Sequence, residues 1–143
     1  MRFANYAIEL PESSPVAGRA ARVILGIRPT DFQHGAGADP GLPRIRVRPD
    51  VVEDLGSEHH LIFAVDAPRV SAEAVRAATE SADGDEVTLL ADDRASFTAR
   101  LDARRTIAPG TEVELALDHR RFHFFEPSTG AVVDGSRRAT LVA

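Results

Sequence analysis

The amino-acid sequence predicts a mainly β protein, built as a small barrel or sandwich of short antiparallel strands. Short runs in which apolar and polar residues alternate recur along the chain, as in half-buried strands. Turn-forming residues separate these runs, and the chain contains 10 Gly and 9 Pro. With 143 residues, 43% of them hydrophobic and 27% charged, the chain has the size and composition of one globular domain.

Each predicted element follows from a local pattern. The run at residues 22–28 is apolar and ends before Pro29, which predicts a strand closed by a turn. In the next run Ile45 and Val47 alternate with arginines, so one face is expected in the core and the other in water. Further strands are predicted at 51–55, 60–66, 97–102 and 112–118, and residues 118–125 are expected to form a turn and a strand. Residues 10–18 and 33–43 are predicted to be loops.

One segment is predicted to be helical. Residues 71–80 are rich in Ala, and Ser71 is suited to cap the N-terminus of a helix. The sequence therefore predicts a β domain with a single helix inserted near residues 71–80.

The composition excludes several kinds of protein. There is no Cys, so disulfides, zinc–thiolate sites and a cysteine nucleophile are ruled out. All 17 basic residues are Arg, against 22 acidic residues and a formal charge of −5. No basic run is longer than Arg104–Arg105 or Arg120–Arg121, which argues against nucleic-acid binding. No apolar run reaches the roughly 18 residues of a membrane span, and the N-terminus has no signal-peptide pattern, so a cytoplasmic location is expected.

No catalytic motif is present. A phosphate-binding loop is impossible without Lys, and neither a Gly-x-Ser-x-Gly elbow nor a Gly-x-Gly-x-x-Gly turn occurs. His119 and His123 would share one face of a helix, but this segment is predicted to be a turn and strand, where the spacing does not suit a metal. His59 and His60 are adjacent, so they should lie on opposite faces of a strand. The acidic residues between 83 and 93 are expected to be solvated, and no catalytic, cofactor or metal site is predicted in this chain.

Three segments, in order along the chain, resemble a known family. Residues 23–32 (VILGIRPTDF), 51–58 (VVEDLGSE) and 107–130, which contains PGTEVELALD and FHFFEPSTG, are similar to the accessory domain of carbohydrate-importer ATPases. The resemblance is to the maltose, glycerol-3-phosphate and trehalose type of ABC importer, and it implies an OB-like β domain, the transport-associated C-terminal regulatory domain. Thr30 stands where the family usually has Glu, Glu126 where it usually has Asp, and residues 69–95 are longer than in compact relatives.

The residues that carry this resemblance are expected to define the fold or an interface. They are Gly26, Arg28, Pro29, Glu53, Leu55, Gly56, Glu58, Gly110, Phe125, Thr129 and Gly130. The two glycines Gly26 and Gly56 suit turns or close backbone approaches. Arg28 is placed to pair with Glu53 or Asp54, Phe124 and Phe125 are expected to anchor the core or an interface, and residues 128–130 should form a turn.

The resemblance implies that residues 1–143 form a single regulatory and dimerisation domain of an ATP-binding subunit that couples ATP hydrolysis to sugar uptake. ATP and Mg²⁺ would bind in a nucleotide-binding domain that we expect outside this chain, because residues 5–11 resemble the strand after the ATPase core. The implied partners are a second copy, the membrane permease subunits and a regulatory protein, at the inner face of the cell membrane. Two alternatives remain: a sensor binding a sugar phosphate or oxyanion between barrels through Ser57, Ser96 or Ser128, and, from the barrel class alone, a nucleic-acid binder.

Overall fold

The computed structural model describes residues 1–70 and 94–134. These residues form ten β-strands and two short 3₁₀ turns. The strands are β1 (Arg2–Phe3), β2 (Tyr6–Ala7), β3 (Ile24–Gly26), β4 (Phe32–His34), β5 (Arg44–Val47), β6 (Val51–Asp54), β7 (Glu58–Pro68), β8 (Arg94–Asp102), β9 (Val113–Leu117) and β10 (His123–Phe125). The 3₁₀ turns are η1 (Pro29–Asp31) and η2 (His119–Arg121). The helix expected near residues 71–80 lies outside the described residues.

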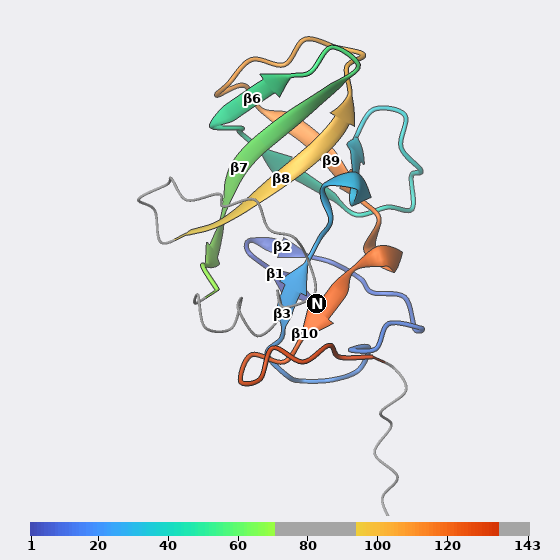
Figure 1. The fold of residues 1–143 in the computed structure, drawn as a ribbon. Helices are drawn as coiled ribbons and strands as arrows, with labels where there is room; N and C mark the ends of the chain where they lie inside the picture. The colour runs from blue at the N-terminus through green and yellow to red at the C-terminus, as the bar shows by residue number, and fades with distance from the viewer. Residues whose placement is uncertain (71–93, 135–143) are drawn as a thin grey trace, which may run out of the picture.

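Two three-stranded antiparallel sheets form the upper part of the molecule (Figure 1). Their strand orders are β4–β9–β5 and β6–β7–β8. The predicted alternation places one face of each strand inside: Ile45 and Val47 of β5 are buried between exposed arginines, and Leu115 and Leu117 of β9 are fully buried. The two sheets share one hydrophobic core, so the fold is the predicted small β barrel or sandwich.

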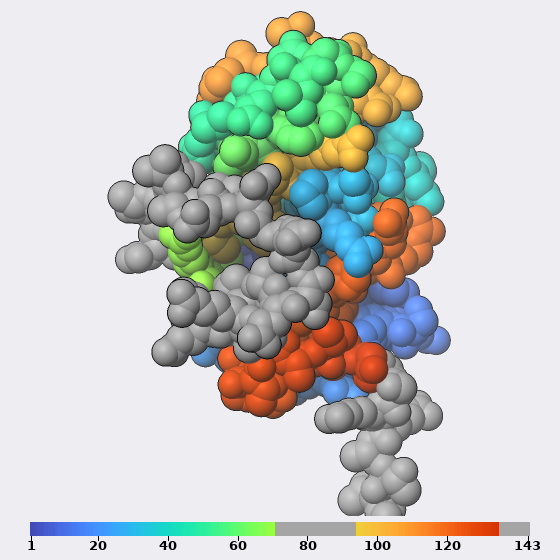
Figure 2. Space-filling view, viewed as in Figure 1, coloured from blue at the N-terminus to red at the C-terminus, as the bar shows by residue number. Residues whose placement is uncertain are grey.

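Two further two-stranded sheets, β1–β2 and β3–β10, lie at the lower end (Figure 1). The space-filling view shows the blue N-terminal segments and the red segment near residue 130 together at this end (Figure 2). Strands β7 and β8 are the longest, and Figure 1 shows them running from the upper part toward the lower end. The chain therefore brings residues near its first and last described positions into one small sheet region.

Two arms of the chain connect the upper and lower sheets. The first arm is β3, η1 and β4, and the second is β9, η2 and β10. The arms run antiparallel, because β3 pairs with β10 at one end and β4 pairs with β9 at the other. The 3₁₀ turns η1 and η2 lie between these two pairings, and we call this region the joint. Pro29 starts η1, where its fixed φ and missing N–H are tolerated, and the Asp118 side chain accepts from the Arg120 amide to start η2.

An aromatic cluster connects the lower hairpin to the barrel core. The Phe97 ring lies 5.6 Å from Phe3, 6.4 Å from Phe32 and 6.3 Å from Phe63 between ring centroids. Phe32 and Phe63 also meet edge to face at 5.7 Å, which joins the two upper sheets. The rings come from β1, β4, β7 and β8, so one cluster ties together strands from both parts of the molecule.

The predicted strands are confirmed, with three corrections to their extent. The strand expected at 22–28 is reduced to β3, whereas β7 extends from Glu58 to Pro68, beyond the apolar run at 60–66. The loop expected at 33–43 begins with a strand, because β4 pairs with the apolar β9. No helix within residues 1–70 and 94–134 is long and apolar enough to cross a membrane.

Candidate functional site

The first family motif packs against the last one where β3 pairs with β10, next to the joint. Gly26 pairs with His123 across β3 and β10, and a Cβ at Gly26 would lie 3.0 Å from the Phe125 ring. Glycine therefore suits the close approach of the half-buried Phe125 ring to this strand. Beside them is a shallow hollow of about 340 Å³, lined by Gly26, Ile27, Arg28, Pro29, His123 and Phe125. Four of the predicted residues thus meet at one place.

The turn that follows β10 is held by hydrogen bonds from the Thr-Gly motif. The Thr129 hydroxyl donates to the Glu126 carboxylate at 3.0 Å, and the Gly130 amide donates to the Glu126 carbonyl at 2.8 Å. Gly130 has a φ of 69°, which confirms the predicted turn. The Val133 amide then donates to the Phe124 carbonyl, which returns the chain to β10. These residues stabilise a turn, and glutamate at 126 supplies the acceptor.

The second family motif forms the tip of the β6–β7 hairpin. Gly56 has a φ of 84°, a conformation that other residues adopt at a cost, and its amide donates to the Asp54 carboxylate at 2.8 Å. Leu55 is exposed at this tip, and Glu53 lies opposite His60 in the strand pair. His59 is buried and His60 is half-exposed, which confirms that the two histidines lie on opposite faces.

Glu58 links the start of β7 to β8 on the outer face of their sheet. The Arg100 side chain donates to one carboxylate oxygen of Glu58, and the other lies 3.3 Å from the His60 Nε2 atom. The hydrogen bond from Arg100 lowers the pKa of the Glu58 carboxyl below its ordinary value of 4.5, and the charges of Arg100 and His60 act in the same direction against desolvation. Glu58 is thus kept ionised as part of a cross-strand polar cluster.

Replacing Glu58 by glutamine should flatten the loss of stability in acid. A carboxyl whose pKa is lowered by folding contributes stability above its unfolded-state value, and this contribution disappears as the pH falls through the folded-state value. The melting temperature of E58Q should therefore lie below that of the wild type at pH 7, and the two should converge as the pH falls through the lowered folded-state pKa of Glu58. Melting curves over this range test the prediction; Glu12→Gln, at an exposed glutamate without an ion pair among the described residues, should follow the wild type.

The predicted motif residues do not form one site. Arg28 makes no ion pair with Glu53 or Asp54 among the described residues, which corrects that expectation: Asp54 lies instead 3.7 Å from His59, and Arg28 is exposed beside the hollow. The Gly110 amide, at the start of the third motif, donates to the Pro49 carbonyl, which precedes β6. The motif residues therefore support separate turns and strand contacts.

The joint contains a buried charge that the sequence did not reveal. The Asp31 side chain is fully buried, and its Oδ1 atom lies 3.1 Å from the Nε atom of Arg121, whose side chain is 53% exposed. Neither carboxylate oxygen accepts a hydrogen bond within the described residues, so Arg121 alone compensates the charge there. The Asp118 amide also donates to the Asp31 carbonyl at 2.9 Å. Asp31 comes from η1 and Arg121 from η2, so this ion pair links the two arms.

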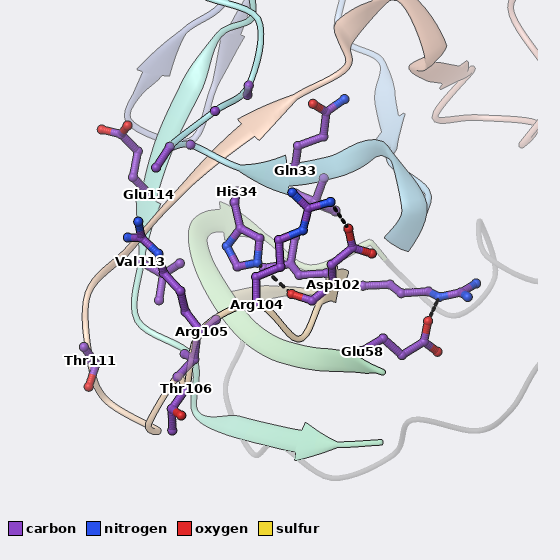
Figure 3. A pocket seen from close by; sticks show the side chains of 18 of the residues that line it. Gln33, His34, Glu58, Asp102, Arg104, Arg105, Thr106, Thr111, Val113 and Glu114 are labelled. Carbon is purple, nitrogen blue, oxygen red and sulfur yellow. Dashed lines mark hydrogen bonds and ion pairs between the residues drawn. The ribbon is translucent and has the colours of Figure 1, made fainter. Parts of the chain in front are cut away.

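The described part of the molecule has an open groove of about 1310 Å³ (Figure 3). It lies where β4, the end of β8 and the start of β9 come together, and no strand ladder joins β4 to β8 there. The His34 Nε2 atom lies 3.0 Å from the Asp102 carbonyl and bridges this gap. Of the predicted motif residues only Glu58 lines the groove, and none of Ser57, Ser96 or Ser128 does.

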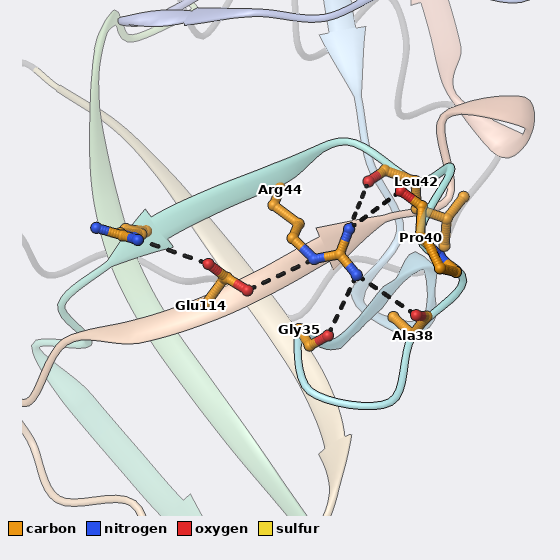
Figure 4. Close-up of polar contacts among 7 residues, drawn as sticks. Gly35, Ala38, Pro40, Leu42, Arg44 and Glu114 are labelled. Atoms are coloured by element: carbon orange, nitrogen blue, oxygen red, sulfur yellow. Dashed lines mark hydrogen bonds and ion pairs between the residues drawn. The ribbon is translucent and has the colours of Figure 1, made fainter.

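One wall of the groove is the loop that follows β4, and Arg44 holds that loop in place (Figure 4). The Arg44 guanidinium donates to the carbonyls of Leu42 at 3.2 Å and of Gly35, Ala38 and Pro40 at 3.4 Å. Its Nε atom lies 3.5 Å from Glu114 of β9. The wall is therefore fixed to β5 and β9 by a single side chain.

Sequence reasoning missed the groove because its polar residues come from distant segments. Arg46 lies on β5, Arg100 on β8, and Arg104 and Arg105 in the following loop. The one local signal of the groove is the pair Arg104–Arg105, which the sequence shows only as a short basic run. These arginines come together only through the pairing of strands that are distant in the sequence, and no short motif connects those strands.

Two comparisons with known proteins bear on identity. The chain is 33% identical over 122 aligned positions to the trehalose import ATP-binding protein SugC of Mycobacterium tuberculosis, in strains CDC 1551 / Oshkosh and ATCC 25618 / H37Rv alike. The aligned region covers 82% of this chain but only 30% of those relatives, so the chain spans less than a third of their length. No protein-family model matches the sequence. Over most of its length, this chain is therefore related to a portion of a carbohydrate-importer ATP-binding protein, which confirms the resemblance carried by its three motifs.

Proposed function

We propose that this chain is the C-terminal regulatory and dimerisation domain of the ATP-binding subunit of a sugar importer. The observation that carries the proposal is the relation to a trehalose import ATP-binding protein, which extends over most of this chain and a minor share of the relative. The three motifs occur in the order that the accessory domain of such proteins has, and the mainly β architecture of the described residues suits that domain.

In this proposal the domain acts mechanically. Two copies would pair through the same surface patch and hold two ATPase cores together while nucleotide exchanges. ATP and Mg²⁺ would bind in those cores, and the full protein would couple hydrolysis to uptake through permease subunits at the inner face of the membrane. The patch would also be open to a regulatory protein. The motif residues fit this role because they brace turns and the joint, which gives a rigid connection.

The exposed apolar side chains offer two places for such a symmetric contact. Leu55 is 55% exposed and Val51 41% exposed, both on the β6–β7 hairpin, whereas Val132 is 64% exposed near the joint. Strand β6 is also at the edge of its sheet among the described strands. We favour the hairpin, because it combines two exposed apolar residues with a strand edge that has free backbone groups.

Light scattering across a concentration series tests the proposal directly. The chain should have the mass of a dimer, and Leu55→Arg should convert it to a monomer at the same concentration. Val132→Arg is the matched control, since it adds the same charge and bulk at the other exposed apolar position and should leave the dimer intact. A chain that stays monomeric at every concentration would contradict self-pairing of this domain, and loss of the dimer only in Val132→Arg would move the contact to the joint.

A further inference from the structure

The lining of the large groove holds four arginines and four carboxylates, and an excess of positive charge results when the two outside arginines that pair with these carboxylates, Arg44 and Arg48, are counted as well. Each of its carboxylates has an arginine within ion-pair distance: Arg44 and Arg46 lie 3.5 and 3.7 Å from Glu114, Arg48 lies 3.7 Å from Glu112, Arg104 lies 3.2 Å from Asp102, and Arg100 contacts Glu58. Adding Arg105, the groove and its ion-pair partners contain six guanidinium groups and four carboxylates. The local excess is two positive charges, whereas the whole chain carries −5.

Arg105 is an arginine of this groove whose charge no carboxylate balances within the described residues. Its exposed side chain makes no ion pair within the described residues. The backbone amides of Arg105, Thr106 and Ile107 likewise donate to no acceptor in residues 1–70 or 94–134. Thr106 and Thr111 line the same groove, and Figure 3 shows Thr106 next to Arg105. A guanidinium, hydroxyls and backbone amides along one groove are hydrogen-bond donors of the kind that oxyanions bind.

Arg104 is available to the same ligand at little cost. Its side chain is 80% exposed and that of its partner Asp102 is 70% exposed, so water screens their ion pair, which contributes little to the stability of the fold. The Arg104 guanidinium can therefore turn from Asp102 toward an anion bound at Arg105. A guanidinium group matches the paired oxygens of a phosphoryl group.

We propose that this groove binds a small molecule bearing a phosphoryl group, with Arg105 and Arg104 holding the phosphoryl oxygens and Thr106 and Thr111 donating further hydrogen bonds. A phosphomonoester carries close to two negative charges at neutral pH, which equals the local excess. The volume of about 1310 Å³ leaves room for an organic group along the apolar side chains of Leu101, Ile107 and Val113. This site lies within a single chain and does not depend on the proposed pairing of two domains.

NMR titration of the chain tests this site. The probes are inorganic phosphate, glucose 6-phosphate and glucose, each added at constant ionic strength maintained with sodium chloride. The two phosphates should shift the amide signals of residues 105–107 and 111 in a saturable manner, and glucose should not. Arg105→Gln should weaken phosphate binding at least about tenfold, the effect of losing one charge-assisted interaction. Glu112→Gln should strengthen it, because this change removes a carboxylate from the groove.

Arg19→Gln is the matched control. Arg19 is exposed outside the groove, so its loss changes the net charge by the same amount and should leave the affinity within about twofold. Tighter binding of glucose 6-phosphate than of phosphate would show that the organic group occupies the groove, and equal affinity would identify phosphate itself as the ligand. Equal weakening in Arg105→Gln and Arg19→Gln, or the same shifts with chloride alone, would overturn the proposal.

Discussion

Replacing Arg121 by alanine should lower the free energy of unfolding by about 3 kcal/mol, because it leaves a buried carboxylate without its cation. Asp31 has a fully buried side chain, and Arg121 is its ion-pair partner across the joint. Half of the Arg121 side chain is in water, so we place the effect at the lower end of the range for buried pairs. Urea denaturation, followed by circular dichroism, measures the change.

A double-mutant cycle separates this charge effect from simple loss of packing. Asp31→Asn removes the buried charge, so adding Arg121→Ala to Asp31→Asn should cost much less than Arg121→Ala alone. Arg120→Ala is a suitable control, because Arg120 is exposed on the same 3₁₀ turn and contacts Asp118. Equal costs for Arg121→Ala with and without Asp31→Asn would show that the ion pair does not stabilise the joint.

Replacing Phe63 by alanine should destabilise the protein by about 3–5 kcal/mol. The side chain is completely buried in β7, and its ring contacts Phe32 edge to face and Phe97 face to face. The substitution would leave a cavity at the point where the two upper sheets meet, and both aromatic contacts would be lost. Because a domain of this size is stable by only about 5–15 kcal/mol, F63A should unfold at much lower urea than the wild type.

Phe63→Leu keeps the test informative where the alanine variant fails to fold. Leucine fills most of the volume, so this variant should fold and lose less than half as much stability as F63A. Glu12→Ala, at an exposed position, should change the unfolding free energy by less than about 0.5 kcal/mol. A loss below about 1 kcal/mol in F63A would mean that the sheets are not held together by this cluster.

Alternation predicted the strands whose two faces differ in environment. In β5 and β9 the apolar residues are inside and Arg46 and Glu114 are outside, so residue order alone was enough. The N-terminal extension of β7 contains Glu58 and His59, whose polar side chains conceal a strand that is held by pairing with β8, and the C-terminal extension is Ala67 and Pro68. The sequence did not predict β4, because Gly and Ala follow it and its partner β9 is far away in the sequence.

The site was less predictable than the fold. The motif residues were found by resemblance, and the structure gives several of them a local structural role, such as Gly26 under the Phe125 ring. The Asp31–Arg121 pair and the groove require knowledge of which distant segments meet. The ring cluster of Phe3, Phe32, Phe63 and Phe97 has no periodic signature, since one ring comes from each of four strands.

The antiparallel arms have a consequence for the order of events during synthesis. Gln33 pairs with Ala116, and Leu25 with Phe124, so the first arm has no partner until the ribosome has passed residue 124. Until then the edges of β3 and β4 are open to other chains, and pairing must await closure of a long loop. Folding of this part of the chain should therefore be slow and should await synthesis of the second arm, and a nascent chain stalled before β9 should be captured by chaperones more readily than one stalled after β10.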